Sequence, residues 1–338
     1  MGDGGESARR RFDVARQNAM QPMDGHTTMQ VRRNDFDVSN RIQMTDPAAV
    51  QREIARLFRL LYPGAAHAGM DAAFTDMARL YRGDYPGYVA CDTLYHDVQH
   101  VMDVTLAMAR LMDGYERSRR NSPAFGVRLF QLGVIVALFH DIGYLRTTQD
   151  TVAKNGAEYT LNHVSRGATF LRNYLPQIGL GEFVEAGAEL VHFTGFEKRV
   201  GDILIEDPLL RMLGSLLGSA DIIAQMSDRC YLEKCRDRLY TEFVAGGIAV
   251  RSTENGKEVV FHSGDDLVRK TPAFFDTAVN RLEYDLGGAY NYAATHFGGF
   301  NLYMHAATKN VHFAKQIGTS NTCELRRTPP ESLTAYGA

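Results

Sequence analysis

The stretch VIVALFHDIGYLRTTQD, residues 134–150, contains the pair of side chains in this sequence best suited to chemistry. A run of apolar residues leads directly into the adjacent His140–Asp141 pair. Burying a carboxylate beside an imidazole costs several kcal/mol unless a partner compensates, and a metal ion compensates well. The simpler interpretation is a capped helix end with a hydrogen-bonded histidine. The pair therefore indicates a metal site if the chain supplies further ligands.

Further candidate ligands occur in several other segments. His96 and His100 are four residues apart, which places them on one face of a predicted helix. Asp221 interrupts the apolar run around Ala220–Ile223, and a carboxylate in such a run needs a partner. His163 lies near the beginning of one predicted helix, and His192 lies towards the end of another. Each segment would bring its ligands from a different helix.

This set of side chains is suited to divalent cations. Neutral imidazoles and ionised carboxylates bind Zn, Mg, Mn or Fe, and an aspartate beside a ligating histidine can bridge two cations. Water held between two such cations becomes hydroxide near neutral pH, and the pair stabilises the attacking and leaving oxygens of a phosphoester. The sequence therefore predicts a site for two divalent metal ions, of undetermined identity, in a helical core.

The elements that must position these residues are predicted to be helical. Apolar residues recur at helical spacing along most of the chain, from a capped start at Thr45–Pro47 onward. Residues 246–262 alone have strand character, around an Asn-Gly pair, and predict a small hairpin or extended loop. We therefore predict one all-α domain at 46–317, between flexible tails at 1–45 and 318–338.

Composition narrows the class of protein. The chain has 338 residues, of which 45% are hydrophobic and 23% are charged, with a net charge of −3. This balance favours neither nucleic acid nor an anionic membrane surface as a partner, and it indicates no oligomeric state. Four cysteines are scattered without paired spacing, which is typical of a reducing compartment. No apolar run reaches the ~18 residues needed to span a bilayer, so we predict a cytoplasmic protein.

Several motifs, in consistent order, resemble a known family. The order His100, His140–Asp141, Asp221 resembles the HD superfamily of metal-dependent phosphohydrolases. Within it, the chain is most similar to the catalytic domain of class I cyclic-nucleotide phosphodiesterases, over roughly residues 90 to 285. The similar stretches are YHDVQHVMDV, HDIGYLRTTQD, LNHVSRGATFL, SADI, DRLYTEF and LVRKTPAFF.

The resemblance implies roles for individual residues. It implies a first metal held by four side chains (His100, His140, Asp141 and Asp221), with the aspartate at 141 also facing a second metal. It implies that His96, one turn before the first ligand, is the general acid that protonates the leaving oxygen. Tyr95, Tyr144 and Phe275 would then contact the substrate, a small nucleotide-like phosphoester, with the phenylalanine clamping the base. The implied activity is that of a metal-dependent phosphodiesterase.

The sequence departs from the family pattern at three positions. Asp97 replaces an asparagine, Tyr144 replaces the second histidine of the HD-x-x-H segment, and Pro272 stands where the family has its purine-selecting glutamine. Proline offers no side-chain hydrogen bond, so recognition of cAMP or cGMP by that route is not predicted.

Two alternatives to a phosphodiesterase stay open. His163 and His192 resemble the additional ligands of dinuclear HD proteins, which include cyclic-dinucleotide phosphodiesterases and a mixed-valence di-iron oxygenase. In the other interpretation these two residues are core histidines or lie behind the ligands. The third hypothesis is a catalytically idle, metal-stabilised binding or regulatory module.

Overall fold

The first helix of the described residues, in the computed structural model, begins where the sequence predicts. The structure describes residues 31–253, 256–318 and 325–332. Helix α2 (Pro47–Leu61) starts with Pro47, and the side chain of its N-cap, Asp46, accepts a hydrogen bond from the backbone N–H of Ala48. Proline suits this position because the first-turn N–H groups have no partner within the helix.

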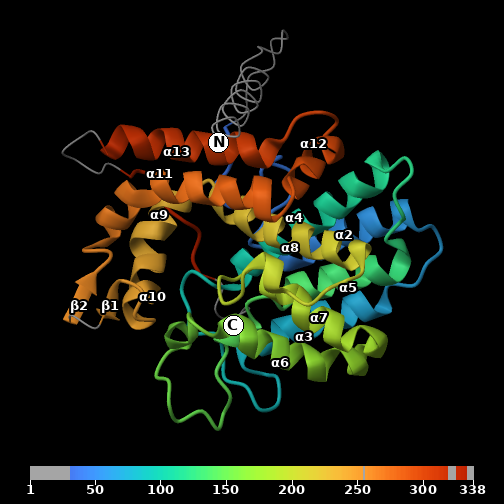
Figure 1. Ribbon diagram of the computed structural model, residues 1–338, viewed down its shortest axis with the longest axis horizontal. Helices are drawn as coiled ribbons and strands as arrows, with labels where there is room; N and C mark the ends of the chain where they lie inside the picture. The colour runs from blue at the N-terminus through green and yellow to red at the C-terminus, as the bar shows by residue number, and fades with distance from the viewer. Residues whose placement is uncertain (1–30, 254–255, 319–324, 333–338) are drawn as a thin grey trace. The chain divides into compact units, whose positions relative to one another are not determined.

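The described chain is predominantly helical, with one small antiparallel sheet, which confirms the predicted all-α fold with a small hairpin (Figure 1). The longer helices after α2 are α3 (Ala68–Arg82), α4 (Val98–Ser118), α5 (Gly126–Leu138), α6 (His163–Tyr174), α8 (Pro208–Ser227), α11 (Gly264–Asn280) and α13 (Leu302–Gly318). Shorter helices are α7 (Val184–Leu190), α9 (Tyr231–Lys234), α10 (Tyr240–Ala245) and α12 (Tyr292–His296). The hairpin pairs β1 (Val250–Thr253) with β2 (Gly256–Val259), inside the predicted range 246–262.

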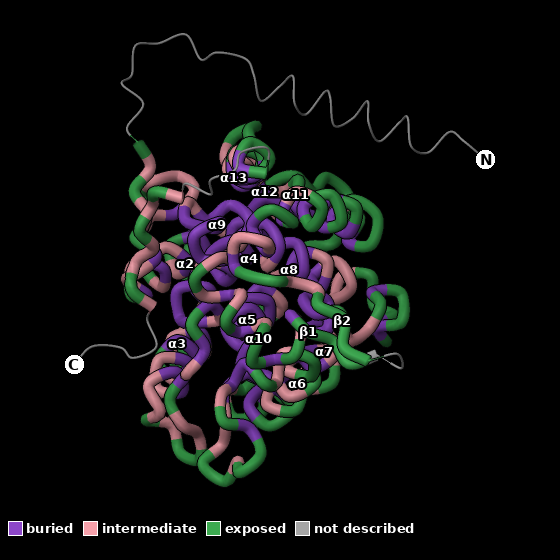
Figure 2. The backbone as a smooth tube through the Cα atoms, turned by 90° about the vertical axis from the view of Figure 1, so that its left-hand side faces the viewer, coloured by how far each residue is buried: buried purple, intermediate pink, exposed green. Residues whose placement is uncertain are grey.

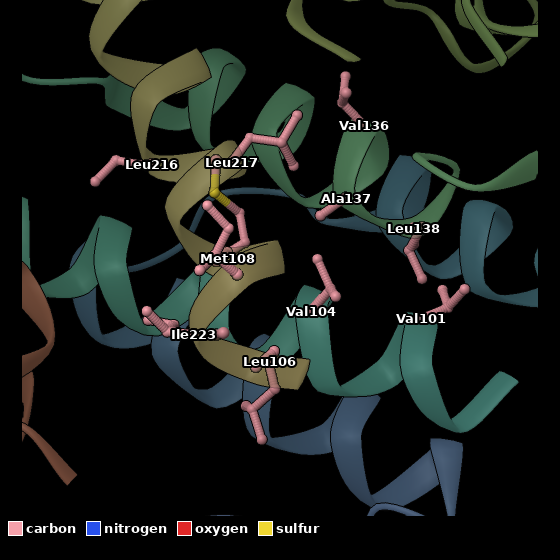
Figure 3. Close-up of a cluster of buried hydrophobic side chains, with 14 of the residues drawn as sticks. Val101, Val104, Leu106, Met108, Val136, Ala137, Leu138, Leu216, Leu217 and Ile223 are labelled. Atoms are coloured by element: carbon pink, nitrogen blue, oxygen red, sulfur yellow. The ribbon is translucent and has the colours of Figure 1, made fainter. Parts of the chain in front are cut away.

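Helices α4, α5 and α8 form the centre of the core. Figure 2 shows buried backbone concentrated along them, and Figure 3 shows their apolar side chains gathered together. The labelled contributors are Val101, Val104, Leu106, Met108, Val136, Ala137, Leu138, Leu216, Leu217 and Ile223, all buried. Removing a large side chain from such a core costs about 2–5 kcal/mol. The three helices therefore hold their ends in fixed relative positions.

Helix α5 and the turn after it form the most apolar stretch of the described chain. Residues Gly126–Tyr144 are long and apolar enough to cross a membrane by length and composition, but 78% of the window is buried inside the protein. Buried core helices pass the same test, so this stretch is explained by its place between α4 and α8.

Described residues outside the predicted domain limits also contact the helices. The compact unit begins at Arg33, and Asp37 is buried against Arg110 of α4, with 2.6 Å between Oδ2 and Nη2. At the other end, the Arg327 backbone N–H donates to Glu233 Oε1 at 3.1 Å. The packed region therefore extends on both sides of the predicted 46–317. The other residues of the two predicted tails lie outside the described residues.

Acid is expected to weaken the protein through Asp37. Burial favours the neutral carboxyl, but Arg110 and the backbone N–H of Ile42 outweigh it and lower the pKa of Asp37 to about 2. A depressed carboxyl pKa stabilises the fold above the unfolded value near 4, and this contribution of about 2 kcal/mol is lost as pH falls to about 2. Urea unfolding at pH 7 and pH 3 should show it.

Asp37→Asn tests the same ion pair at neutral pH. The amide leaves the buried Arg110 charge unpaired, so the free energy of unfolding should fall by about 3–5 kcal/mol. The matched control is Asp84→Asn, because Asp84 pairs with Arg82 at an exposed site, where loss of a pair costs under about 1 kcal/mol. Equal effects of the two substitutions would contradict the assignment.

Candidate metal centre

His100 stands in the first turn of α4. The helix is capped by Asp97, whose Oδ1 accepts a hydrogen bond from the His100 backbone N–H at 3.0 Å. His96 precedes this cap, so it does not share a helical face with His100 as predicted. The four-residue spacing matched a helix, but the aspartate between the two histidines starts the helix after His96, because its side chain satisfies a first-turn N–H.

The His140–Asp141 pair lies just beyond the end of α5. The helix stops at Leu138, and the pair occupies the turn before a short 3-10 segment, Ile142–Tyr144. His140 Nδ1 donates to the Ala137 carbonyl at 2.8 Å. In the neutral imidazole this leaves Nε2 as the bare ligand atom and fixes the orientation of the ring.

Three ligand atoms meet at this turn. His100 Nε2 lies 3.3 Å from His140 Nε2 and 3.2 Å from Asp141 Oδ2, and the remaining pair is separated by 3.1 Å. Ligand atoms at about 2.1 Å from a cation lie about 3.0–3.4 Å apart in octahedral or tetrahedral arrangements. The spacing of the three atoms therefore fits one divalent cation between them.

The hydrogen bonding and charge of the cluster also favour a bound cation. Asp141 Oδ2 is buried, and the two imidazole nitrogens beside it are not aligned as hydrogen-bond donors, which is costly for a carboxylate oxygen without a cation. Burial would raise the pKa of Asp141, but the neighbouring His140 and His100 hold it well below its usual range. Burial would lower the pKa of His140, but Asp141 raises it to about 9. The ionised Asp141 carboxylate thus favours a positive charge beside it, which a metal cation would supply.

Asp221 of α8 supplies a fourth candidate ligand. Its Oδ1 lies 3.6 Å from His100 Nε2 and 3.9 Å from His140 Nε2. The Asp221 side chain is 14% exposed, whereas His140 is 1% exposed, so the cluster is more open on the side of α8. The four side chains implied as ligands of the first metal therefore converge.

The second oxygen of Asp141 faces a different histidine. His163, the first residue of α6, places Nε2 3.5 Å from Asp141 Oδ1, and its Nδ1 donates to the Thr160 carbonyl at 2.8 Å. Gly143 permits this approach, because a Cβ there would lie 1.8 Å from the His163 carbonyl oxygen. Asp141 therefore has one oxygen directed at each side, as a bridging carboxylate requires.

His96 is held by a carboxylate that the sequence analysis did not assign. Its Nδ1 lies 2.5 Å from Oε2 of Glu242 in α10, which is 146 residues away in the chain. Burial would lower the pKa of His96, but the charge and hydrogen bond of Glu242 raise it to about 8. Glu242 therefore favours the protonated form of His96. The clue to Glu242 was its position in DRLYTEF, one of the stretches that resemble the phosphodiesterases.

Aromatic rings pack directly against these histidines. The Tyr144 ring is stacked between those of His96 and His163, with 4.3 Å between ring centroids on both sides. The Tyr95 ring lies 5.1 Å from that of His96 and 5.8 Å from that of His100. Both tyrosines are buried, so they brace the histidine rings, and their predicted contact with substrate stays a prediction.

Two predicted site residues have other surroundings. His192 lies in a 3-10 turn after α7, and its buried Nδ1 makes no hydrogen bond. Besides burial, the charges that act on its pKa are those of Lys198, Glu189, Glu197 and Arg172. Phe275 of α11 is buried in the hydrophobic core. The structure thus brings neither into the described metal cluster, and their roles as ligand and base clamp stay predictions.

Comparison with known proteins gives no relative. No protein-family model matches the chain, and neither the curated proteins nor the solved structures compared with it match. The geometry supports a helical domain with a buried group, His100, His140 and Asp141, that could hold a metal ion. This group is compatible with an HD-type site. The identity and number of the metals are not determined by this geometry.

Proposed function

We propose that this protein is a metal-dependent phosphohydrolase of the HD type, and that it hydrolyses a nucleotide-like phosphodiester. The observation that carries the proposal is a histidine held by a carboxylate beside a group of side chains that could bind a metal ion. The His96 ring stands edge-on to that of His100, with 5.6 Å between centroids, and is held by Glu242. A binding or regulatory module has no need of such a histidine.

The side chains divide the chemistry between them. A divalent cation bound by His100, His140, Asp141 and Asp221 would supply hydroxide near neutral pH and neutralise charge on the phosphoester. Because Glu242 engages Nδ1 of His96, the proton available to substrate is on Nε2. That proton would pass to the leaving oxygen, which otherwise departs as a strong base.

The proposed substrate class rests on the resemblance to the class I cyclic-nucleotide phosphodiesterases and on the positions where this sequence departs from their pattern. Similarity to the class I cyclic-nucleotide phosphodiesterases favours a nucleotide-like diester, and a cyclic nucleotide is one candidate. Pro272 lies inside α11 and carries no side-chain donor or acceptor, so selection of a purine by a glutamine at this position is not available.

A phosphoester panel tests the proposal. The full chain, with metal content measured by inductively coupled plasma mass spectrometry, would be assayed with Mn, Mg, Zn or Fe. The substrates would be cAMP, cGMP, cyclic dinucleotides and p-nitrophenyl mono- and diesters. We expect turnover of at least one diester that stops on chelation and returns with cation. Metal bound without turnover of any ester would reject the proposal.

A second candidate is a dinuclear-iron oxygenase of the same superfamily. The observation in its favour is His163, whose Nε2 faces the oxygen of Asp141 directed away from the first ligand group. Anaerobic purification after expression in iron-rich medium, followed by visible and EPR spectroscopy, separates the two. Iron at two ions per chain with a mixed-valence EPR signal and no ester turnover would favour the oxygenase.

A further inference from the structure

A short C-terminal segment is fastened to the helical unit. We call residues 325–332 the C-terminal strap. Arg327 donates from its backbone N–H to Glu233 Oε1 at 3.1 Å and from Nη1 to the Arg229 carbonyl at 2.6 Å. One residue on, the Thr328 carbonyl accepts from Asn34 Nδ2 at 3.1 Å. The strap thus contacts Glu233 in α9, Arg229 just before α9, and Asn34 near the start of the described residues.

The strap ends beside the turn that carries His96. The Pro330 carbonyl accepts a hydrogen bond from Arg238. Two residues further, Ser332 Oγ lies 2.8 Å from Asp97 Oδ2 and 3.2 Å from the Leu94 carbonyl oxygen, to either of which its hydroxyl can donate. Arg238 Nη1 approaches the same Asp97 oxygen at 3.8 Å. Strap and arginine therefore converge on one carboxylate oxygen.

The turn between Leu94 and Asp97 is held by hydrogen bonds to two residues, Glu242 and Ser332. Glu242 Oε1 accepts the backbone N–H of Tyr95 at 2.5 Å and that of His96 at 3.3 Å. The two carboxylate oxygens of Asp97 have different partners: Oδ1 caps α4, and Oδ2 faces Ser332. The cap on α4 therefore does not need the strap. Losing the Ser332 contact would loosen the turn that carries His96, which Glu242 would still hold, and would leave α4 and its ligand in place.

We propose that the C-terminal strap positions the acid, with Ser332 as the positioning residue that fixes the turn carrying His96 through Asp97. The inference rests on the proposed function for its effect on catalysis. Ser332 is half-buried, and its side chain makes hydrogen bonds only to Asp97 and the Leu94 carbonyl among the described residues. The end of the strap at Ser332 can therefore open while Arg327, Thr328 and Pro330 keep their hydrogen bonds.

Three substitutions at Ser332 test the proposal. Ser332→Ala removes the donor, and we expect kcat to fall about 3- to 10-fold with KM and metal content unchanged. Ser332→Thr keeps the hydroxyl and should restore kcat. Ser332→Glu sets a carboxylate against Asp97 and should lower kcat more than alanine does. The matched control is Glu331→Gln at the exposed neighbouring residue, with no expected effect.

Hydrogen–deuterium exchange provides a readout that does not depend on activity. Amides of residues 94–100 should exchange faster in Ser332→Glu than in the wild type and in Glu331→Gln. Unchanged exchange there, or kcat within twofold of wild type in both the alanine and glutamate variants, would overturn the strap proposal. Faster exchange in a protein that hydrolyses no ester would reject the proposed function and support the strap as a structural clamp on the turn.

Discussion

Asp141→Asn is expected to leave the protein folded but unable to retain a divalent cation. The substitution removes the charge between His100 and His140 and the carboxylate oxygen directed at His163. Wild type should be stabilised by about 2.7 kcal/mol at a metal concentration 100 times its Kd. The variant should show none of this stabilisation and less than about a tenth of the bound metal.

The metal-free comparison makes this result specific. Metal-free wild type keeps the contacts of Asp141 with His100 and His140, so each protein is compared with itself: added cation should raise the unfolding temperature of the wild type and leave that of the asparagine variant unchanged. Metal content after gel filtration and thermal unfolding with and without chelator measure both quantities. Asp202→Asn, at an exposed position, is the control. Wild-type metal content in Asp141→Asn would show that this cluster is not the metal site.

His96→Asn should lower kcat by about 10²- to 10⁴-fold with metal content unchanged, because a general acid contributes by that factor. Glu242→Gln should have a smaller effect, about 10- to 100-fold, typical of a residue that acts through another. The glutamine keeps an oxygen for the Tyr95 and His96 backbone N–H groups but lacks the charge that holds the imidazolium.

The leaving group provides a sharper test of the acid. A p-nitrophenolate departs without protonation, whereas the alkoxide of a nucleoside needs a proton. Both substitutions should therefore reduce turnover of a nucleoside diester far more than turnover of a p-nitrophenyl ester. Glu206→Gln, on the exposed surface, should leave both rates unchanged. An equal loss on the two substrates would assign His96 and Glu242 to structure instead of proton transfer.

Local sequence predicted most of the elements because the deciding interactions are local. The N-cap at Asp46 with Pro47 and the apolar periodicity of α8 are visible in single short windows, and both appear in the structure. The same kind of reasoning failed at His96, where residue spacing suggested one helix. A capping aspartate between two histidines is also a local feature, so this error was avoidable.

The ligand group was predicted because its residues conflict with their surroundings. A carboxylate after the apolar run of α5, and another within that of α8, are costly to bury alone. Such conflicts are visible residue by residue, and the structure places His100, His140, Asp141 and Asp221 together. For His192 the residue type alone does not distinguish a ligand from a core histidine, and its role as a ligand stays a prediction.

The sequence by itself determined the fold class and the chemistry that the candidate ligands favour. Only the tertiary structure decided which groups meet. The contact between His96 and Glu242 spans 146 residues, and the one between Ser332 and Asp97 spans 235. No periodicity or spacing in the sequence predicts such contacts, because they form only when α4, α5, α8 and the neighbouring elements pack together. That packing turns scattered polar residues into one candidate site.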